Sequence, residues 1–315
     1  MDNFKTWVVG LDLTNKDNFI LKNTAALAKK SAPEVIHFVY FPARPDLPQE
    51  VLHDIPDLQV PEIQYYESSI TKEVQEHFDS EIDWKIHVRE GNALTEILRL
   101  LNNISADLLI LGRGEHTGTL GRKLPRKAPC SVLLIPSKEI KEINTIAVPV
   151  DFSPYSDRAL NTAKSSADAY GVKDIHVLHV YQDASKYLNQ TFETSFEVQE
   201  VLAKNKVIDE KLKSYALHKL MEYLNAVEGP DHPLKPHVTS INRTKEVGDA
   251  IHDWVMERDI DMLVMGSKGQ SAAAAVLLGS VPEQVYSQHF DKYILLAKKK
   301  GENISLIKAL LKSKA

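Results

Sequence analysis

The stretch TIAVPVDFS, residues 145–153, decides the architecture of this chain because it occurs twice. Its counterpart near the start is TWVVGLDLT, residues 6–14. Both are apolar runs rich in β-branched residues that end in an aspartate, Asp12 in the first and Asp151 in the second. An apolar strand that ends in a carboxylate once in each half predicts an internal duplication.

The repeat extends beyond this strand. Each copy is followed by an alanine-rich helical segment and a second apolar strand, EVIHFVYF in the first half and DIHVLHVY in the second. Each half then continues with a half-buried strand, a helix and an apolar strand that ends at a glycine, Gly112 or Gly266. Regular alternation of strands and helices predicts a parallel sheet with helices on both faces.

The predicted fold class is therefore α/β, with two tandem flavodoxin-like or Rossmann-like domains, each a five-stranded parallel sheet. A polar link at 137–144 divides the chain, so we expect one domain over 1–138 and a second over 143–300. The charged segment 192–226 predicts a long helix. Its counterpart in the first half, 42–63, is rich in proline and is predicted to be irregular.

The last segment, 301–315, is basic, with Ile304, Ile307 and Leu311 at helical spacing. This pattern predicts a C-terminal helical tail that docks on the protein or on a partner. Docking on an anionic membrane surface is the weaker alternative because the segment is short.

Composition narrows the class of protein. The chain has 315 residues, a hydrophobic content of 43% and a net charge of -5, which gives no indication of general nucleic-acid binding. Cys130 is the single cysteine, which fits a reducing compartment. It lies in an apolar run and is expected to be buried.

No apolar run reaches the ~20 residues of a membrane helix, and the N-terminus resembles a strand rather than a signal peptide. We therefore expect a cytoplasmic protein.

A glycine-containing stretch, GSKGQSAAAAVLLGS at 266–280, is the strongest candidate for a site. In a doubly wound sheet, ligands bind beyond the carboxyl ends of the strands where the strand order reverses, and the strands that lead to Asp151 and Gly266 should end there together. Glycines let backbone N–H groups approach an anion, and a helix that begins near Ser280 would present its free N–H groups. Lys268 could add a charge, and Asp151 could bind ribose hydroxyls or a divalent cation.

A purely structural alternative stays open for the same residues. Ser280 and Glu283 have the spacing of a capping box, so Ser280 could be only an N-cap. The stretch is not a P-loop, because no Gly-Lys-Ser/Thr follows at the required spacing.

The stretch resembles the universal stress protein family, whose nucleotide-binding members carry G-x-x-G, nine residues and then G-[ST]. Here Gly266 and Gly269 are followed by nine residues and then by Gly279 and Ser280. The resemblance spans both halves and implies ATP as the ligand, with Mg²⁺ as an accompanying ion. The ATP contacts that it implies are Asp151, Val180, Met265, Gly266, Ser267, Gly269, Gly279, Ser280 and Val281.

The first half departs from this pattern. Gly112 aligns with Gly266 and Gly118 with Gly279, but the interval is seven residues shorter and Glu115 stands in place of the middle glycine. A carboxylate would repel a triphosphate, so we expect no ATP in the first domain although Asp12 is retained.

The functional hypothesis is an ATP-binding sensor or regulator of stress responses. No catalytic residue and no metal site are predicted, and at most slow ATP hydrolysis is expected. The alternatives are a ligand-free interaction scaffold and a slow ATP-hydrolysing enzyme. The resemblance implies that the two domains pair as a pseudo-dimer, that two chains could form a homodimer, and that an unknown protein partner reads the state of the site.

Overall fold

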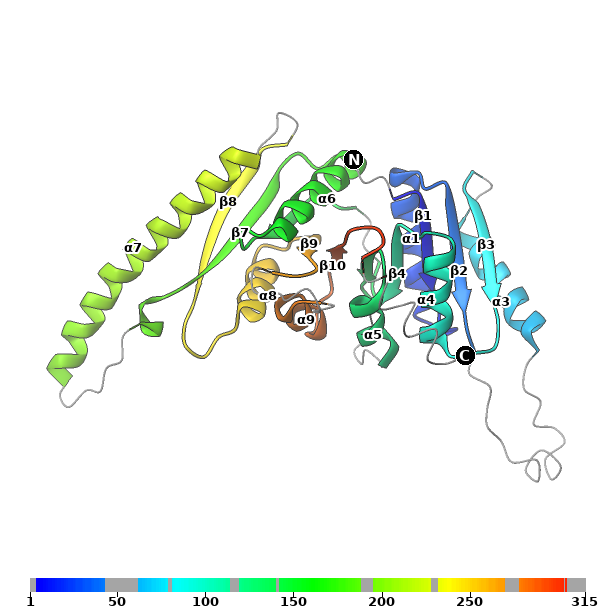
Figure 1. Cartoon of the computed structure of the whole chain (residues 1–315), viewed down its shortest axis with the longest axis horizontal. Coiled ribbons are helices and arrows are strands. Elements are labelled where there is room, and N and C mark those ends of the chain that lie inside the picture. Colours follow the sequence, from blue (N-terminus) through cyan, green and yellow to red (C-terminus); the bar gives the residue numbers. More distant parts are fainter. Residues whose placement is uncertain are drawn as a thin grey trace, which may run out of the picture. The chain divides into compact units, whose positions relative to one another are not determined.

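Figure 1 shows the computed structural model of the chain. The structure describes residues 4–42, 62–78, 81–113, 119–139, 142–187, 195–227, 232–269, 278–302 and 304, and only the backbone of 119 and 195–204. The contacts divide the chain into two compact units. One unit is Glu142–Ala297, and the other combines the chain up to Lys141 with the chain from Lys298 onward.

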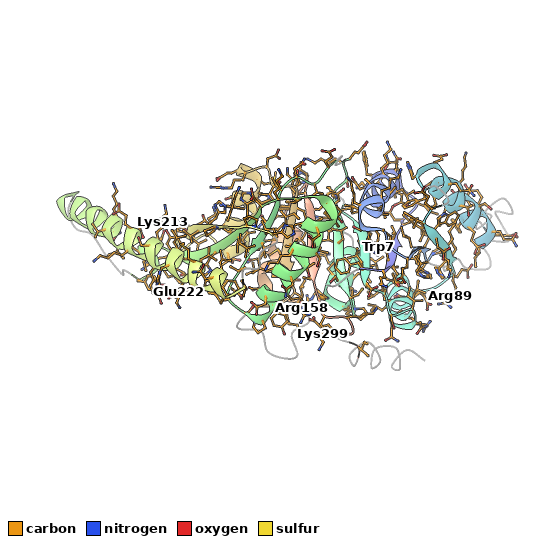
Figure 2. The ribbon with its side chains drawn as sticks, turned by 90° about the horizontal axis from the view of Figure 1, so that it is seen from above. Trp7, Arg89, Arg158, Lys213, Glu222 and Lys299 are labelled. Carbon is orange, nitrogen blue, oxygen red and sulfur yellow. The ribbon has the colours of Figure 1, made fainter. Side chains whose placement is uncertain are left out.

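The first unit is a parallel sheet with the strand order β3-β2-β1-β4-β5. Its elements are β1 (Thr6–Gly10), α1 (Asp17–Ser31), β2 (Val35–Tyr40), α3 (Ile63–His77), β3 (Asp83–Val88), α4 (Ala93–Asn103), β4 (Leu108–Gly112), α5 (Thr119–Lys127) and β5 (Ser131–Ile135). The central strands are buried along most of their length, and Trp7 is only 1% exposed (Figure 2).

The second unit repeats this topology, with the strand order β10-β9-β6-β7-β8 and parallel pairing. Its elements are β6 (Ile146–Pro149), α6 (Pro154–Tyr170), β7 (Ile175–Gln182), the short 3-10 helix η1 (Ala184–Lys186), α7 (Ser195–Val227), β8 (Leu234–Ile241), α8 (Val247–Glu257), β9 (Met262–Gly266), α9 (Ser280–Ser287) and β10 (Tyr293–Ala297). Two five-stranded parallel sheets confirm the predicted fold class.

The helices of the second unit cover its sheet on both faces. The crossovers through α6 and α8 run in opposite directions along the sheet, so right-handed connections place them on opposite faces. α7 packs along β7 and β8 (Figure 1) and is tied to α6 by Lys164, whose ammonium donates to the Val227 carbonyl at 2.7 Å. α8 and α9 pack against each other.

The long helix α7 spans 33 residues and confirms the helix predicted over 192–226. Lys213 and Glu222 are among its exposed charged side chains (Figure 2). The segment 43–61, which holds most of the region predicted to be irregular, lies outside the described residues. The same is true of 305–315, which holds most of the predicted C-terminal tail.

Cys130 is buried as predicted, with 1% exposure, and burial raises the pKa of its thiol to about 12. A thiol of this kind is inert at neutral pH. None of the helices in the described part of the chain is long and apolar enough to cross a bilayer.

Candidate functional site

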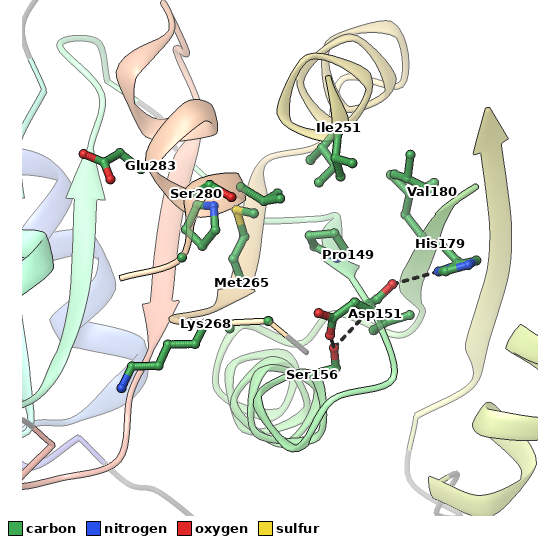
Figure 3. Close-up of a pocket in the computed structure, with 18 of the residues that line it drawn as sticks. Pro149, Asp151, Ser156, His179, Val180, Ile251, Met265, Lys268, Ser280 and Glu283 are labelled. Atoms are coloured by element: carbon green, nitrogen blue, oxygen red, sulfur yellow. Dashed lines mark hydrogen bonds between the residues drawn. The ribbon is translucent and has the colours of Figure 1, made fainter. Parts of the chain in front are cut away.

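A cavity of about 600 Å³ lies at the carboxyl ends of β6 and β9 in the second unit (Figure 3). These two strands are neighbours in the sheet, and the strand order reverses between them. Asp151 follows the end of β6, Gly266 ends β9, and both line the cavity. The crevice expected from the topology is therefore present where the glycine-containing stretch begins.

Eight of the nine residues that the sequence singled out line this cavity. They are Asp151, Val180, Met265, Gly266, Gly269, Gly279, Ser280 and Val281. The ninth, Ser267, is fully buried, with 0% exposure.

The two ends of the glycine loop lie side by side. The Gly279 N–H donates to the Ser267 carbonyl at 2.8 Å, and a Cβ on Gly279 would lie 3.3 Å from the Cα of Lys268. The intervening residues 270–277 lie outside the described part of the chain. Close approach of the two backbone segments explains why glycine follows the spacer, because any side chain there would press against the opposite strand of the loop.

Gly269 lies directly against the carboxylate of Asp151. A Cβ at position 269 would come within 2.6 Å of the Asp151 Oδ2 atom, well inside normal contact distance. The absence of a side chain at 269 therefore keeps the space between the glycine loop and Asp151 open.

Asp151 itself is held in place by the turn that follows β6. Its Oδ1 atom accepts from the Ser156 hydroxyl at 2.8 Å and from the Ser153 N–H at 3.1 Å. The next residue, Phe152, has a left-handed φ of 63° and stacks on the His179 ring with 4.4 Å between centroids. His179 in turn bonds the Val150 carbonyl through Nδ1 at 3.0 Å, so the cavity edge around Asp151 is rigidly braced.

Burial lowers the pKa of His179, which keeps this imidazole neutral at pH 7 and preserves its contact with the backbone.

Helix α9 begins at the cavity, but its cap differs from the capping-box alternative. Gly279 is the N-cap, Ser280 is the first helical residue, and no side chain caps the helix. The Glu283 carboxylate lies on the side of α9 that points away from Asp151 (Figure 3). The first N–H groups of α9 are thus not taken up by a capping side chain, and they carry the positive end of the helix dipole.

The charge expected from Lys268 is directed elsewhere. Its ammonium lies over the Tyr155 ring, 5.8 Å from the centroid, and Figure 3 shows the side chain extending away from the cavity. Of the described lining residues, Lys268 is the one lysine or arginine. Any anion bound here would therefore depend on backbone N–H groups.

The opposite wall of the cavity is apolar and comes from three elements. Pro149 ends β6, Met265 lies in β9, and Val247 and Ile251 come from α8. The sequence analysis did not identify Pro149, Val247 or Ile251. The helical periodicity of α8 marks its buried face but does not reveal which turns reach a cavity.

The backbone of β7 is exposed to the cavity beyond the end of β6. Pairing between these strands stops at Pro149 and Leu178, whereas β7 continues to Gln182. Val180 lies in this extension and lines the cavity. Val180 thus has no pairing residue in β6 on that side, which suits recognition of a planar base edge by its main chain.

The equivalent crevice of the first unit has a different side chain against the glycine that ends its fourth strand. Ile20 of α1 packs against Gly112, where a Cβ would come within 2.4 Å of the Ile20 Cδ1 atom. Ile20 stands eight residues after Asp12, and the residue eight after Asp151 is the smaller Ala159. Residues 114–118, including Glu115, lie outside the described part of the chain.

The first unit also carries an additional carboxylate. Asp17 is fully buried and accepts from the N–H groups of Leu13 at 2.7 Å and Asp12 at 3.1 Å. Burial, together with the nearby Asp12 carboxylate, raises the pKa of Asp17 to about 7. At the corresponding position the second unit has Ser156, a neutral hydroxyl. The Asp12 and Asp17 carboxyl groups therefore disfavour an anion in the first crevice.

Comparison with known proteins gives a family match in both halves. The model of the universal stress protein family matches residues 3–136 and again residues 142–289. A universal stress protein of Thermus aquaticus is 27% identical over 144 residues, which cover 46% of this chain and 91% of that protein.

A solved structure of similar length agrees with the fold. A universal stress protein from Archaeoglobus fulgidus DSM 4304 superposes with a TM-score of 0.62 at 16% identity, over 94% of this chain and 96% of that one. A universal stress protein in complex with cAMP matches 43% of this chain and 99% of its own, with 21% identity and a TM-score of 0.30.

Proposed function

Because the chain belongs to the universal stress protein family, with one copy of the domain in each half, we propose that it is a regulatory protein that binds ATP in its second domain. The observation that carries this proposal is the cavity in which the ends of the glycine loop, Asp151 and the start of α9 come together. In this account the first domain binds no ATP.

Each part of the cavity has a role in this proposal. The N–H groups of Gly269 and Ser280 and the dipole of α9 would receive the phosphates, since glycine loops and helix N-termini bind anions through backbone donors. The apolar wall of Pro149, Val180 and Ile251 would enclose the adenine ring. This division matches the polar and apolar sides of the cavity (Figure 3).

Asp151 would accept hydrogen bonds from the ribose hydroxyls or hold the Mg²⁺ that accompanies ATP. Its Oδ1 atom accepts from Ser153 and Ser156, and its Oδ2 atom lies toward Gly269. Mg²⁺ prefers carboxylate and phosphate oxygens, so either role fits the chemistry of this side chain.

The small molecules that remain bound to the purified protein test the proposal. Mass spectrometry of small molecules released by denaturing the freshly purified full-length chain should find ATP in amounts that approach one per chain. Absence of any nucleotide, combined with no ATP uptake by the purified chain, would contradict the proposal and favour a ligand-free scaffold.

Replacing Asp151 by asparagine should weaken ATP binding about 10- to 100-fold, because a hydrogen bond to a charged group contributes about 1.5–3 kcal/mol. Asparagine keeps the shape and one acceptor oxygen, so the turn after β6 should survive. Isothermal titration of the full-length chain measures the change. The matched control is Asp157→Asn, since Asp157 bonds Tyr223 on α7 and does not line the cavity. Equal affinities in the two variants would contradict the role assigned to Asp151.

A further inference from the structure

Each unit holds a pair of histidine rings between its second strand and its edge strand. In the first unit His37 Nδ1 lies 2.7 Å from His87 Nε2, and in the second unit His176 Nδ1 lies 3.0 Å from His237 Nε2. The same two ring nitrogens meet in both pairs. The ring planes are 25° and 23° apart and the centroids are 5.0 and 5.1 Å apart, so the two arrangements are nearly identical.

The pairs also occupy the same register. His37 of β2 is opposite Lys85 of β3, two residues before His87. His176 of β7 is likewise opposite Lys235 of β8, two residues before His237. The two halves differ in their glycine loops but share this histidine pair. The pair therefore has a role that does not depend on the glycine loop.

The contact requires that the rings are not both protonated. At these distances one ring nitrogen must donate its N–H to the lone pair of the other, which only a neutral imidazole can offer. If both rings became imidazolium ions, the hydrogen bond would be replaced by repulsion between two cations.

The charges around the first pair add to this repulsion. Besides burial, Lys85 of β3 lowers the pKa of both rings, and Arg89, which follows β3, lowers the pKa of His87. Asp83 raises the pKa of His37. On the adjoining helix α4, Glu96 is bound by Arg89 and by Arg99.

The second pair has a similar environment. Lys235 of β8 and Arg258, which follows α8, lower the pKa of both rings. Asp174 raises the pKa of His176 but is engaged by the Lys235 ammonium.

Burial is the largest cause of the pKa shifts in all four rings. It lowers the pKa of His37 and of His237 to about 4, with the partner histidine as the second cause, and it also lowers the pKa of His87 and His176. The unfolded chain therefore takes up protons first as the pH falls. The stability contributed by each pair is complete at neutral pH and is lost between pH 6.5 and about 4.

The second pair also supports a wall of the nucleotide cavity. The Trp254 ring of α8 packs against His237 and His176, with centroids 5.1 and 6.4 Å apart, and Arg258 covers Trp254 at 4.6 Å. One and two turns earlier on the same helix, Ile251 and Val247 line the cavity.

We propose that the His37–His87 and His176–His237 pairs are acid-sensitive clasps that hold the edge strands β3 and β8 to their sheets at neutral pH and loosen them in acid. In the second domain, and resting on the proposed function, the clasp also sets ATP affinity, because loosening it frees Trp254 and shifts the α8 wall. The signal to which each clasp responds is protonation of its histidine rings.

The first test is the unfolding of the full-length chain by urea at pH 7 and pH 5. For one ring whose pKa falls from 6.5 to about 4, linkage gives a ~20-fold rise in the unfolding constant. Solvent screening of a partly exposed pair reduces this rise to about 5- to 10-fold. The double variant H37Q/H237Q should lose most of this pH dependence. The control H218Q should retain it, since His218 is an exposed residue of α7 outside both pairs. Unchanged pH dependence in H37Q/H237Q would overturn the proposal.

The second measurement uses only the wild-type chain, so it does not depend on the folding of any variant. Imidazole NMR spectra of the wild-type chain should show His37 and His237 neutral at pH 5.5. Protonated His37 and His237 at pH 6 would overturn the proposal.

The third measurement separates this inference from the proposed function. ATP affinity of the wild-type chain should fall between pH 5.5 and pH 4 by more than that of H237Q, because His237 of the folded chain takes up its proton near pH 4. This comparison cancels the titration of ATP itself. An equal fall in both would overturn the link to α8. Absence of ATP binding at either pH would refute the proposed function, and the unfolding and NMR results would still decide whether the clasps exist.

Discussion

Replacing Gly269 by valine is expected to lower ATP affinity by at least ~100-fold, or about 2.7 kcal/mol of binding free energy. Even a single Cβ at this position would lie 2.6 Å from the Asp151 Oδ2 atom. Asp151 cannot easily turn aside, because Ser153 and Ser156 hold its other oxygen. The branched side chain would therefore fill the space between the glycine loop and Asp151 that the phosphates and ribose need.

The control for this variant is Gly171→Ala. Gly171 ends α6 with a φ of 73°, and a Cβ there would meet no atom within 4 Å. Alanine in this left-handed position should destabilise the same domain by about 1 kcal/mol without touching the cavity. Isothermal titration should thus show normal ATP affinity in G171A and an affinity at least ~100-fold lower in G269V. Normal affinity in G269V would mean that ATP does not use this loop.

Replacing Lys298 by methionine should destabilise the first unit by about 2–3 kcal/mol, because it leaves three backbone carbonyls without their donor. The Lys298 ammonium is buried and donates to the carbonyls of Pro125 at 2.7 Å, Ala128 at 3.1 Å and Arg126 at 3.3 Å. These carbonyls lie at the end of α5, where a cation is also favoured by the helix dipole.

Urea unfolding of the full-length chain at pH 7, followed by the fluorescence of Trp7 and Trp84, measures this loss in the first unit. The matched variant is Lys299→Met, which changes an exposed neighbour. If K298M unfolds at the same urea concentration as K299M, the buried lysine does not stabilise the first unit.

The sequence was sufficient to predict the topology because it depends on local patterns. Apolar runs of strand length that alternate with helical segments define each element, and the rule for doubly wound sheets then brings Asp151 and Gly266 to one crevice. The resemblance implied that Gly266 and Gly279 belong to one site, and in the structure the Gly279 N–H donates to the carbonyl of Ser267, the neighbour of Gly266.

Details that depend on packing between distant segments could not be predicted from the sequence. The ammonium of Lys268 lies over Tyr155, more than a hundred residues away in the chain, and α8 supplies Ile251 to the cavity wall. The pairing of His176 with His237 could not be predicted from the sequence, because that contact depends on the register of β7 against β8.

Equilibrium dialysis of the wild-type chain against Mg-ATP tests the central claim most directly, because it counts bound nucleotide without relying on a heat of binding. The account predicts saturation at one ATP per chain, with a dissociation constant on the order of micromolar, and no uptake by G269V. Saturation at two ATP per chain, undiminished uptake by G269V, or no uptake by the wild-type chain would contradict it.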